Sequence, residues 1–164
     1  MPEPKPDTVT IPARDNYPLA ATLYRTEATY RGMVVINAAT AVPRRFYRHF
    51  AAALAEAGFN ALTWDYRGIG GSRPPSLRGF AARARDWVLL DMAGVLDWVG
   101  STIGPEHLFL VGHSFGGQTA GLLDNASAVD GMATMSAQSG HWRLQGGAQK
   151  LVAVSYTHLR AHET

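Results

Sequence analysis

The sequence HLFLVGHSFGGQTAGLL, residues 107–123, contains the most informative pattern of this chain. Its first five residues are a largely apolar run typical of a strand, its last seven are typical of a helix, and GHSFG lies between them at 112–116. A strand, then G-x-S-x-G, then a helix is the sequence form of a sharp turn that presents a serine. Gly112 and Gly116 permit this turn because a β-carbon at either position would crowd the neighbouring strand or helix. We therefore expect Ser114 at the tip of the turn, with a strained backbone and an exposed hydroxyl.

On both sides of this motif, apolar runs alternate with helical patterns. The first two expected strands flank a turn-forming segment, which indicates an opening hairpin. The third is an unbroken apolar run of the kind that fills a strand buried on both faces. Strands that alternate with helices predict a mostly parallel sheet with helices on both faces. The expected strands are residues 8–12, 19–25, 33–36, 59–64, 107–111 and 129–135, and the expected helices are residues 43–57 and 80–99.

The helical spacing of apolar residues predicts which side of each helix faces the core. Large apolar side chains at this spacing are most simply core, so we assign them no function. Gly58 is expected to end the first helix. The core-facing residues predicted in this way are Phe46, Phe50, Leu54 and Ala57 in the first helix and Trp87, Leu90, Val95 and Trp98 in the second.

Composition excludes several classes of protein. The 164 residues are 46% hydrophobic and 17% charged, with a formal net charge of +2, which suits a globular α/β domain and gives no sign of nucleic-acid binding. The absence of cysteine excludes disulfides and thiolate zinc sites. Residues 1–7 lack the apolar segment of a signal peptide, and no run approaches the roughly 20 apolar residues of a membrane span. We therefore expect a cytoplasmic protein.

The sequence contains no motif that indicates a cofactor or a metal. Residues 68–71, GIGG, do not form the G-x-G-x-x-G of a dinucleotide site, and no G-x-x-x-x-G-K-[ST] occurs. An H-E-x-x-H motif or a comparable group of ligands is also absent. We expect neither a cofactor nor a metal.

A second motif gives the chain a family resemblance. Residues 64–72, WDYRGIGGS, resemble the D-x-R-G-x-G-x-S turn that α/β-hydrolases carry after their fourth strand. With GHSFG following later, the chain resembles the N-terminal half of a serine α/β-hydrolase. Residues 36–143 are similar to an uncharacterised bacterial subgroup near the serine aminopeptidase and monoacylglycerol-lipase-like hydrolases. The resemblance implies a truncated α/β-hydrolase fold over residues 1–152, with the start of a lid near 139–152.

The end of the chain has a different character. Residues 154–164, VSYTHLRAHET, read as translated sequencing adapter, and the adapter's preceding bases would complete the codon of Ala153. A segment of this origin is not part of the natural fold. We therefore expect the natural sequence to end near Val152, and residues 153–164 to contribute nothing to the site.

The resemblance implies a catalytic role for Ser114. In this superfamily the nucleophilic serine is followed by an acid and then by a histidine base, both after later strands, and we expect those beyond the truncation. The oxyanion hole is implied to use the N–H of Phe115 and that of Ala39, with Thr40 as the neighbour that could replace Ala39. Asn37 could be a polar wall of the pocket or a cap for its turn.

Other polar residues have simpler roles in this interpretation. His113 adjoins the nucleophile and is expected to pack beneath the turn. His141 is the remaining candidate for a substitute base. Asp65 and Arg67 are expected to brace their turn, and Trp142 either lines an acyl pocket or packs the lid.

The function implied is hydrolysis of an ester, thioester or amide through an acyl-enzyme on Ser114. The substrate would be a small acyl compound, and the oligomeric state is left open. The fragment itself is expected to show little turnover because it lacks the acid and the base. Two alternatives remain, a non-catalytic protein of the same fold that binds a ligand or partner, and an acyltransferase.

Overall fold

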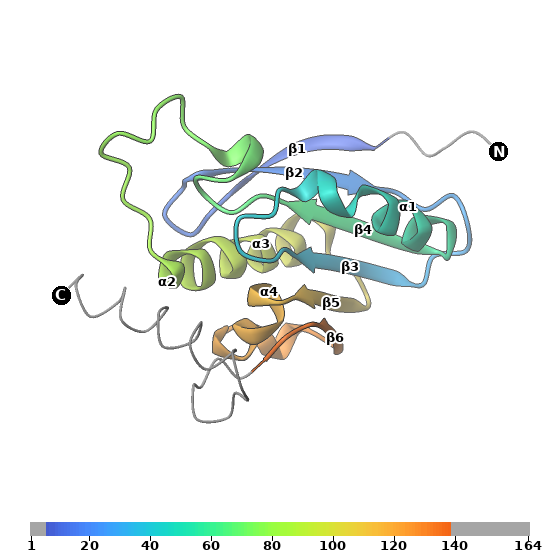
Figure 1. Cartoon of the computed structure of the whole chain (residues 1–164). Coiled ribbons are helices and arrows are strands. Elements are labelled where there is room, and N and C mark those ends of the chain that lie inside the picture. Colours follow the sequence, from blue (N-terminus) through green and yellow to red (C-terminus); the bar gives the residue numbers. More distant parts are fainter. Residues whose placement is uncertain (1–5, 139–164) are drawn as a thin grey trace.

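A six-stranded sheet forms the centre of the computed structural model, which describes residues 6–138 (Figure 1). Its strands are β1 (Asp7–Pro12), β2 (Pro18–Tyr24), β3 (Gly32–Asn37), β4 (Phe59–Trp64), β5 (Leu108–His113) and β6 (Gly131–Met135). They lie in the order β1-β2-β4-β3-β5-β6. β3 pairs in parallel with β4 and β5, and β5 pairs in parallel with β6, whereas β2 is antiparallel to both β1 and β4. The predicted opening hairpin and mostly parallel sheet are confirmed.

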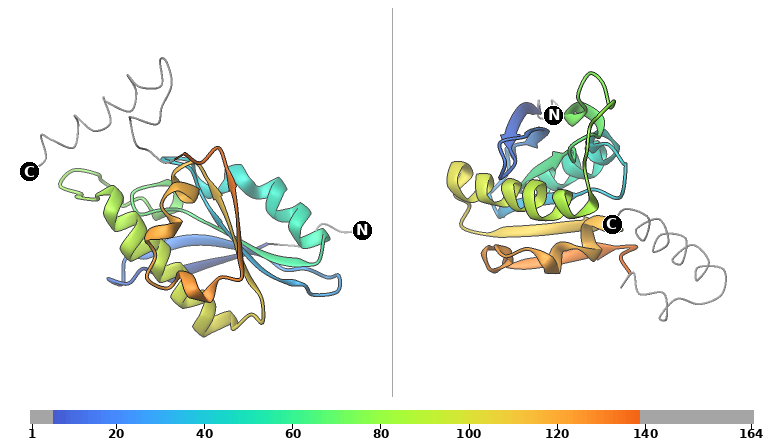
Figure 2. Two further views of the ribbon diagram at one scale, coloured as in Figure 1. Left: turned by 90° about the horizontal axis from the view of Figure 1, so that it is seen from below. Right: turned by 90° about the vertical axis from the view of Figure 1, so that its left-hand side faces the viewer.

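Helices cover both faces of this sheet. On one face lies α1 (Arg48–Glu56), which follows a short 3₁₀ turn at Arg44–Tyr47. On the other lies one long helical segment, made of α2 (Ala84–Asp86), a π-helical stretch, α3 (Ala93–Trp98) and further π-helical turns that end at Ile103 (Figure 2). The short α4 (Phe115–Gln118) follows β5. The predictions for the lid, His141, Trp142 and residues 153–164 lie outside the described residues.

The predicted core-facing side of α1 is correct for Leu54, which packs against the core, and wrong for the two phenylalanines. Phe46 and Phe50 are 64% and 40% exposed. Tyr47, Ala51 and Ala55 are buried instead. The 3₁₀ turn at the start of this segment has three residues per turn, which rotates the later side chains relative to a continuous α-helix. Small alanines on the inner side let the helix lie close to the sheet.

The long helical segment also differs from its prediction. It begins at Ala84 rather than at residue 80. At this start the Asp86 carboxylate accepts the Arg83 N–H at 2.9 Å. It continues to Ile103, and Gly104 with φ 59° ends it. Of the four residues predicted to face the core, Val95 is fully buried, Trp87 and Trp98 are partly buried against the core, and Leu90 is half-buried. The core side consists of Val88, Met92, Ala93, Val95, Leu96 and Val99.

Asp65 holds the turn that follows β4. Its carboxylate accepts the backbone N–H groups of Arg44 at 2.6 Å and Gly71 at 2.8 Å, and it forms an ion pair with the Arg44 guanidinium. Its carbonyl accepts the Ser72 hydroxyl at 2.7 Å, and that hydroxyl in turn accepts the Ala20 N–H at 2.8 Å. These contacts agree with a structural role for Asp65.

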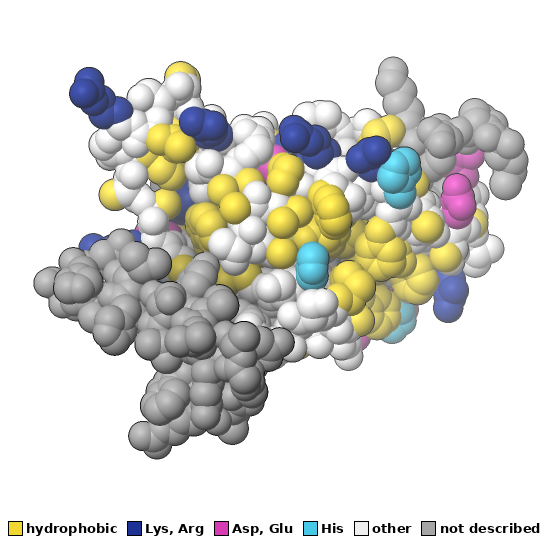
Figure 3. All heavy atoms as spheres, in the orientation of Figure 1, with side chains coloured by type: hydrophobic (Ala, Val, Ile, Leu, Met, Phe, Trp, Pro, Cys, Tyr) yellow, Lys and Arg dark blue, Asp and Glu magenta, His cyan; other side chains and the backbone are white. Residues whose placement is uncertain are grey.

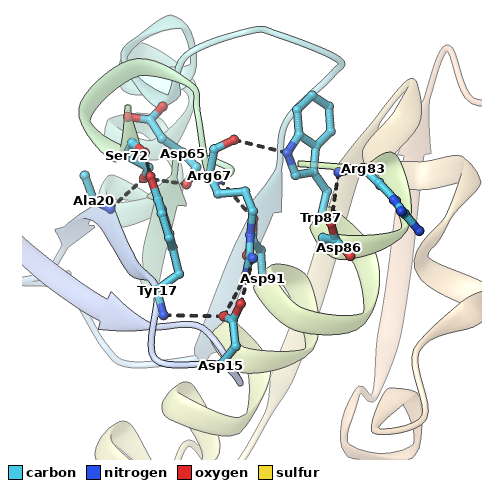
Figure 4. Close-up of polar contacts among 10 residues, drawn as sticks. All are labelled: Asp15, Tyr17, Ala20, Asp65, Arg67, Ser72, Arg83, Asp86, Trp87 and Asp91. Carbon is cyan, nitrogen blue, oxygen red and sulfur yellow. Dashed lines mark hydrogen bonds and ion pairs between the residues drawn. The ribbon is translucent and has the colours of Figure 1, made fainter. Parts of the chain in front are cut away.

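Arg67 braces the same turn from the other side. Figure 4 shows its guanidinium between Asp15 and Asp91. It donates to both carboxylate oxygens of Asp15 at 2.7 Å, and its Nε donates to Asp91 at 2.7 Å. Asp91 is fully buried on the long helical segment, and burial raises the pKa of its carboxyl above the ordinary value despite the adjacent Arg67. The Arg67 side chain therefore joins the turn to the first hairpin and to the long helical segment.

Replacing Arg67 with methionine is expected to lower the free energy of unfolding by about 3–5 kcal/mol, because a buried carboxylate would lose its partner. Urea denaturation of the chain measures this change. The matched control is Arg25→Met, which breaks the exposed pair Arg25–Asp7 and should cost less than about 1 kcal/mol. Equal stabilities of the two variants would contradict the bracing role.

Candidate active site

Ser114 lies at the turn between β5 and α4, as the motif predicts. Its backbone has φ 48° and ψ −112°, a conformation that non-glycine residues rarely adopt. Its N–H donates to the Met135 carbonyl at 2.8 Å. Its own carbonyl accepts the N–H groups of Gly117 at 3.0 Å and Gln118 at 2.9 Å. These hydrogen bonds hold the strained residue in place, with the side chain half-buried.

The glycines of the turn are required by close backbone contacts. A β-carbon on Gly112 would lie 2.4 Å from the Cα of Gly117. One on Gly116 would lie 2.4 Å from the carbonyl oxygen of Asn37. Each contact is to backbone, which a rotamer change cannot relieve. The turn is thus packed directly against the end of β3, where the loop predicted to supply an oxyanion donor begins.

Asn37 ends β3 beside the turn. Its side-chain oxygen accepts the indole N–H of Trp64 at 3.1 Å, and the residue is 1% exposed. Its Nδ2 has no hydrogen-bond partner among residues 6–138. The side chain therefore braces a core tryptophan, and its contacts are not those of a turn cap.

Tyr47 connects the loop after β3 to the turn. The N–H of Ala39 donates to the Tyr47 hydroxyl at 2.9 Å. The same hydroxyl lies 2.9 Å from Nδ1 of His113, and the two rings meet edge-on with their centroids 6.0 Å apart. The Ala39 N–H, which was predicted as an oxyanion donor, is therefore engaged by a side chain in this structure. The Phe115 N–H has no acceptor among the described residues.

Tyr66 holds the same loop from a second side. Its hydroxyl donates to the Ala38 carbonyl at 3.2 Å, and its ring meets that of Phe115 edge-on at 5.8 Å. Burial raises the pKa of both Tyr47 and Tyr66 above the ordinary value, so both hydroxyls are protonated at neutral pH. Sequence reasoning missed both tyrosines. The one local signal was the position of Tyr66 inside the WDYRG motif.

No histidine within residues 6–138 is both beside Ser114 and paired with a carboxylate. His113 is half-buried and contacts Tyr47. His49 lies exposed on α1, and His107 lies 3.4 Å from Asp130 at the opposite end of β5 from the turn. Within residues 6–138 there is no cluster of three or more His, Cys, Asp or Glu side chains that could hold a metal. In that same part of the chain, no helix has the length and apolar character needed to cross a membrane.

A shallow depression of about 390 Å³ lies beside the turn. Figure 3 shows hydrophobic side chains gathered over this face, which carries α1. The outward positions of Phe46 and Phe50 create much of this apolar surface. The depression is lined by Phe46, Tyr47, Phe50, His113, Met135 and Ser136.

Comparison with known proteins finds one matching family, one curated relative and solved structures of similar fold. The family described as serine aminopeptidase, S33 matches residues 23–161. Epoxide hydrolase A of Mycobacterium tuberculosis is 37% identical over 93 residues, which is 55% of this chain and 27% of that protein. The Pyrococcus furiosus esterase Pf2001 superposes with a TM-score of 0.64 at 18% identity, over 76% of this chain and 46% of that one. XC6422 of Xanthomonas campestris, an α/β serine hydrolase without a lid, superposes with a TM-score of 0.63 at 19% identity. The match covers 84% of this chain and 64% of that one.

Proposed function

Because the chain belongs to the serine aminopeptidase S33 family of α/β-hydrolases, we propose that the complete protein hydrolyses an ester, thioester or amide through an acyl-enzyme on Ser114. The chain spans 27% of the curated relative and 46% of the Pf2001 esterase, so the proposed activity is that of a longer protein containing it. The observation that carries the proposal is the strained Ser114 at the strand-to-helix turn. A strained backbone held by its surroundings is typical of functional positions.

In the proposed reaction the Ser114 hydroxyl attacks the acyl carbonyl while a base takes its proton. The tetrahedral intermediate then expels the leaving group, which receives that proton, and a water molecule releases the acid from Ser114 in a second, equivalent step. No described residue is placed to act as the base. The proposal therefore assigns the acid and the base to residues outside 6–138.

The Phe115 N–H is the first proposed donor to the intermediate's oxyanion, since it has no acceptor within the described part of the chain. The proposed second donor is the Ala39 N–H, which would share its proton between the Tyr47 hydroxyl and the oxyanion in a bifurcated hydrogen bond. Thr40, the next residue, offers the alternative N–H. In such sites each well-placed donor contributes roughly 3–4 kcal/mol to the transition state.

The test is turnover of p-nitrophenyl esters by the complete protein. We expect hydrolysis that a fluorophosphonate abolishes, with acyl-chain preference read from a series of esters of increasing length. A complete protein that binds such esters but neither hydrolyses them nor is labelled by the fluorophosphonate would support the non-catalytic alternative. Transfer of the acyl group to an added alcohol in preference to water would support the acyltransferase alternative.

The present chain alone is expected to hydrolyse p-nitrophenyl acetate near the background rate, because no base is placed beside Ser114 in residues 6–138. Loss of the base in serine hydrolases generally costs several orders of magnitude. Spectrophotometric release of p-nitrophenol measures the rate. Robust turnover that Ser114→Ala removes would contradict this expectation, and would make His141 the first candidate for the base.

A further inference from the structure

We infer that Tyr47 and Tyr66 are positioning residues of this site, which together fix the Ala38–Ala39 peptide relative to the turn that carries Ser114. The inference rests on the proposed function, in which this peptide contributes to the oxyanion hole. Tyr47 lies at the start of α1 and Tyr66 follows β4, so neither belongs to the Ser114 turn or to the Ala38–Ala39 peptide.

The first observation is that one peptide unit is held at both of its polar ends. The carbonyl of Ala38 and the N–H of Ala39 belong to the same peptide bond, and they point to opposite sides of it. Tyr66 donates to that carbonyl at 3.2 Å, and Tyr47 accepts from that N–H at 2.9 Å. The two hydroxyls therefore restrict rotation of the peptide plane.

The second observation is that each tyrosine also contacts a different neighbour of Ser114. Tyr47 lies 2.9 Å from Nδ1 of His113, which precedes Ser114. The Tyr66 ring packs edge-on against Phe115, which follows Ser114, with centroids 5.8 Å apart. Each tyrosine thus joins the loop to the turn, one on each side of the serine.

The third observation is that both tyrosines are rigidly held. Tyr66 is fully buried, with its ring 4.4 Å from that of Trp64 and 5.0 Å from that of Trp87 by centroid. Tyr47 is 4% exposed, where the 3₁₀ turn joins α1. The Tyr47 hydroxyl, which accepts the Ala39 N–H, also forms a hydrogen bond with Nδ1 of His113, in which the donor depends on the imidazole tautomer.

The hydrogen bonds are tested on the present chain by NMR of Tyr47→Phe and Tyr66→Phe. We expect Tyr47→Phe to move the Ala39 amide proton upfield and to change the ¹⁵N shift of His113 Nδ1. Tyr66→Phe should move the Ala38 carbonyl ¹³C signal. Tyr24→Phe is the matched control, because Tyr24 is 8% exposed and lies on β2, whereas the hydrogen bonds of the Ala38–Ala39 peptide go to Tyr47 and Tyr66. It should leave all three signals in place.

The positioning role is tested in the complete protein. Each of the two variants should label about tenfold more slowly with a fluorophosphonate. Without its tyrosine the Ala39 N–H moves away from the oxyanion, and the transition state loses part of its stabilisation. For an ester substrate the loss should fall on kcat, with KM little changed. Tyr24→Phe should label at the wild-type rate, and thermal melts identify any loss due to unfolding alone.

Wild-type labelling rates in folded Tyr47→Phe and Tyr66→Phe would overturn the inference, as would unchanged Ala39 and His113 signals. A wild-type complete protein that never labels would overturn the proposed function and the positioning role with it. The NMR result separates these two failures, because it reports the hydrogen bonds without any catalysis.

Discussion

Replacing Ser114 with alanine in the complete protein is expected to lower kcat for an activated ester by several orders of magnitude. The reason is that the acyl-enzyme cannot form without the hydroxyl, so only binding and the oxyanion donors remain to assist water. Initial rates with p-nitrophenyl butyrate measure the loss. Alanine and serine both have a β-carbon and are equally strained at φ 48°. The substitution should therefore retain the fold with little change in melting temperature.

Ser101→Ala provides the matched control for this substitution. Ser101 lies exposed near the end of the long helical segment, and its hydroxyl donates only to the Trp98 carbonyl at 3.3 Å. It should leave kcat unchanged. A Ser114→Ala protein that keeps more than about a tenth of the wild-type rate would show that another residue carries the chemistry, since a lost nucleophile costs far more.

Replacing Gly116 with alanine is expected to lower turnover about 100-fold and the free energy of unfolding by about 1–3 kcal/mol. The new β-carbon would lie 2.4 Å from the Asn37 carbonyl oxygen, so the turn must move away from the end of β3. That movement separates Ser114 from the loop at Ala38–Ala39. Ester turnover and urea denaturation measure the two effects.

Gly100→Ala is the control for a glycine in a helical segment. A β-carbon there would have no atom within 4 Å, so this substitution should leave activity unchanged and stability equal or slightly higher. Wild-type turnover in Gly116→Ala would contradict the close packing of the turn against β3. Gly112→Ala should behave as Gly116→Ala does, because its β-carbon would lie 2.4 Å from the Cα of Gly117.

The sheet was predictable because its signals are local. The apolar run at 33–36 lies within β3, in which all six residues are buried, and the expected strand at 59–64 coincides with β4. The turn at Ser114 was also encoded locally, by two glycines whose β-carbons would overlap backbone. The inner side of α1 was not predictable in this way, because a 3₁₀ turn changes the spacing on which the prediction depends.

The candidate site was only partly predictable for a related reason. The turn after β5 was located from its motif, and the loop after β3 from the family resemblance. The hydrogen bond from the Ala39 N–H to Tyr47 could not be predicted from the sequence, since that contact depends on how α1 lies against the sheet. The same holds for Arg67 and Asp91, whose pairing joins a turn to a distant helical segment. Contacts between elements set the orientation of each group, whereas the motifs set only its position along the chain.

Mass spectrometry of the complete protein after treatment with a fluorophosphonate tests whether Ser114 is the nucleophile. Peptide mapping should find a single phosphonyl adduct, located on Ser114, whose formation follows the loss of esterase activity in time. Denatured protein should remain unlabelled, because the adduct requires the folded site. An adduct on a different residue, or inhibition without an adduct on Ser114, would contradict the proposed mechanism.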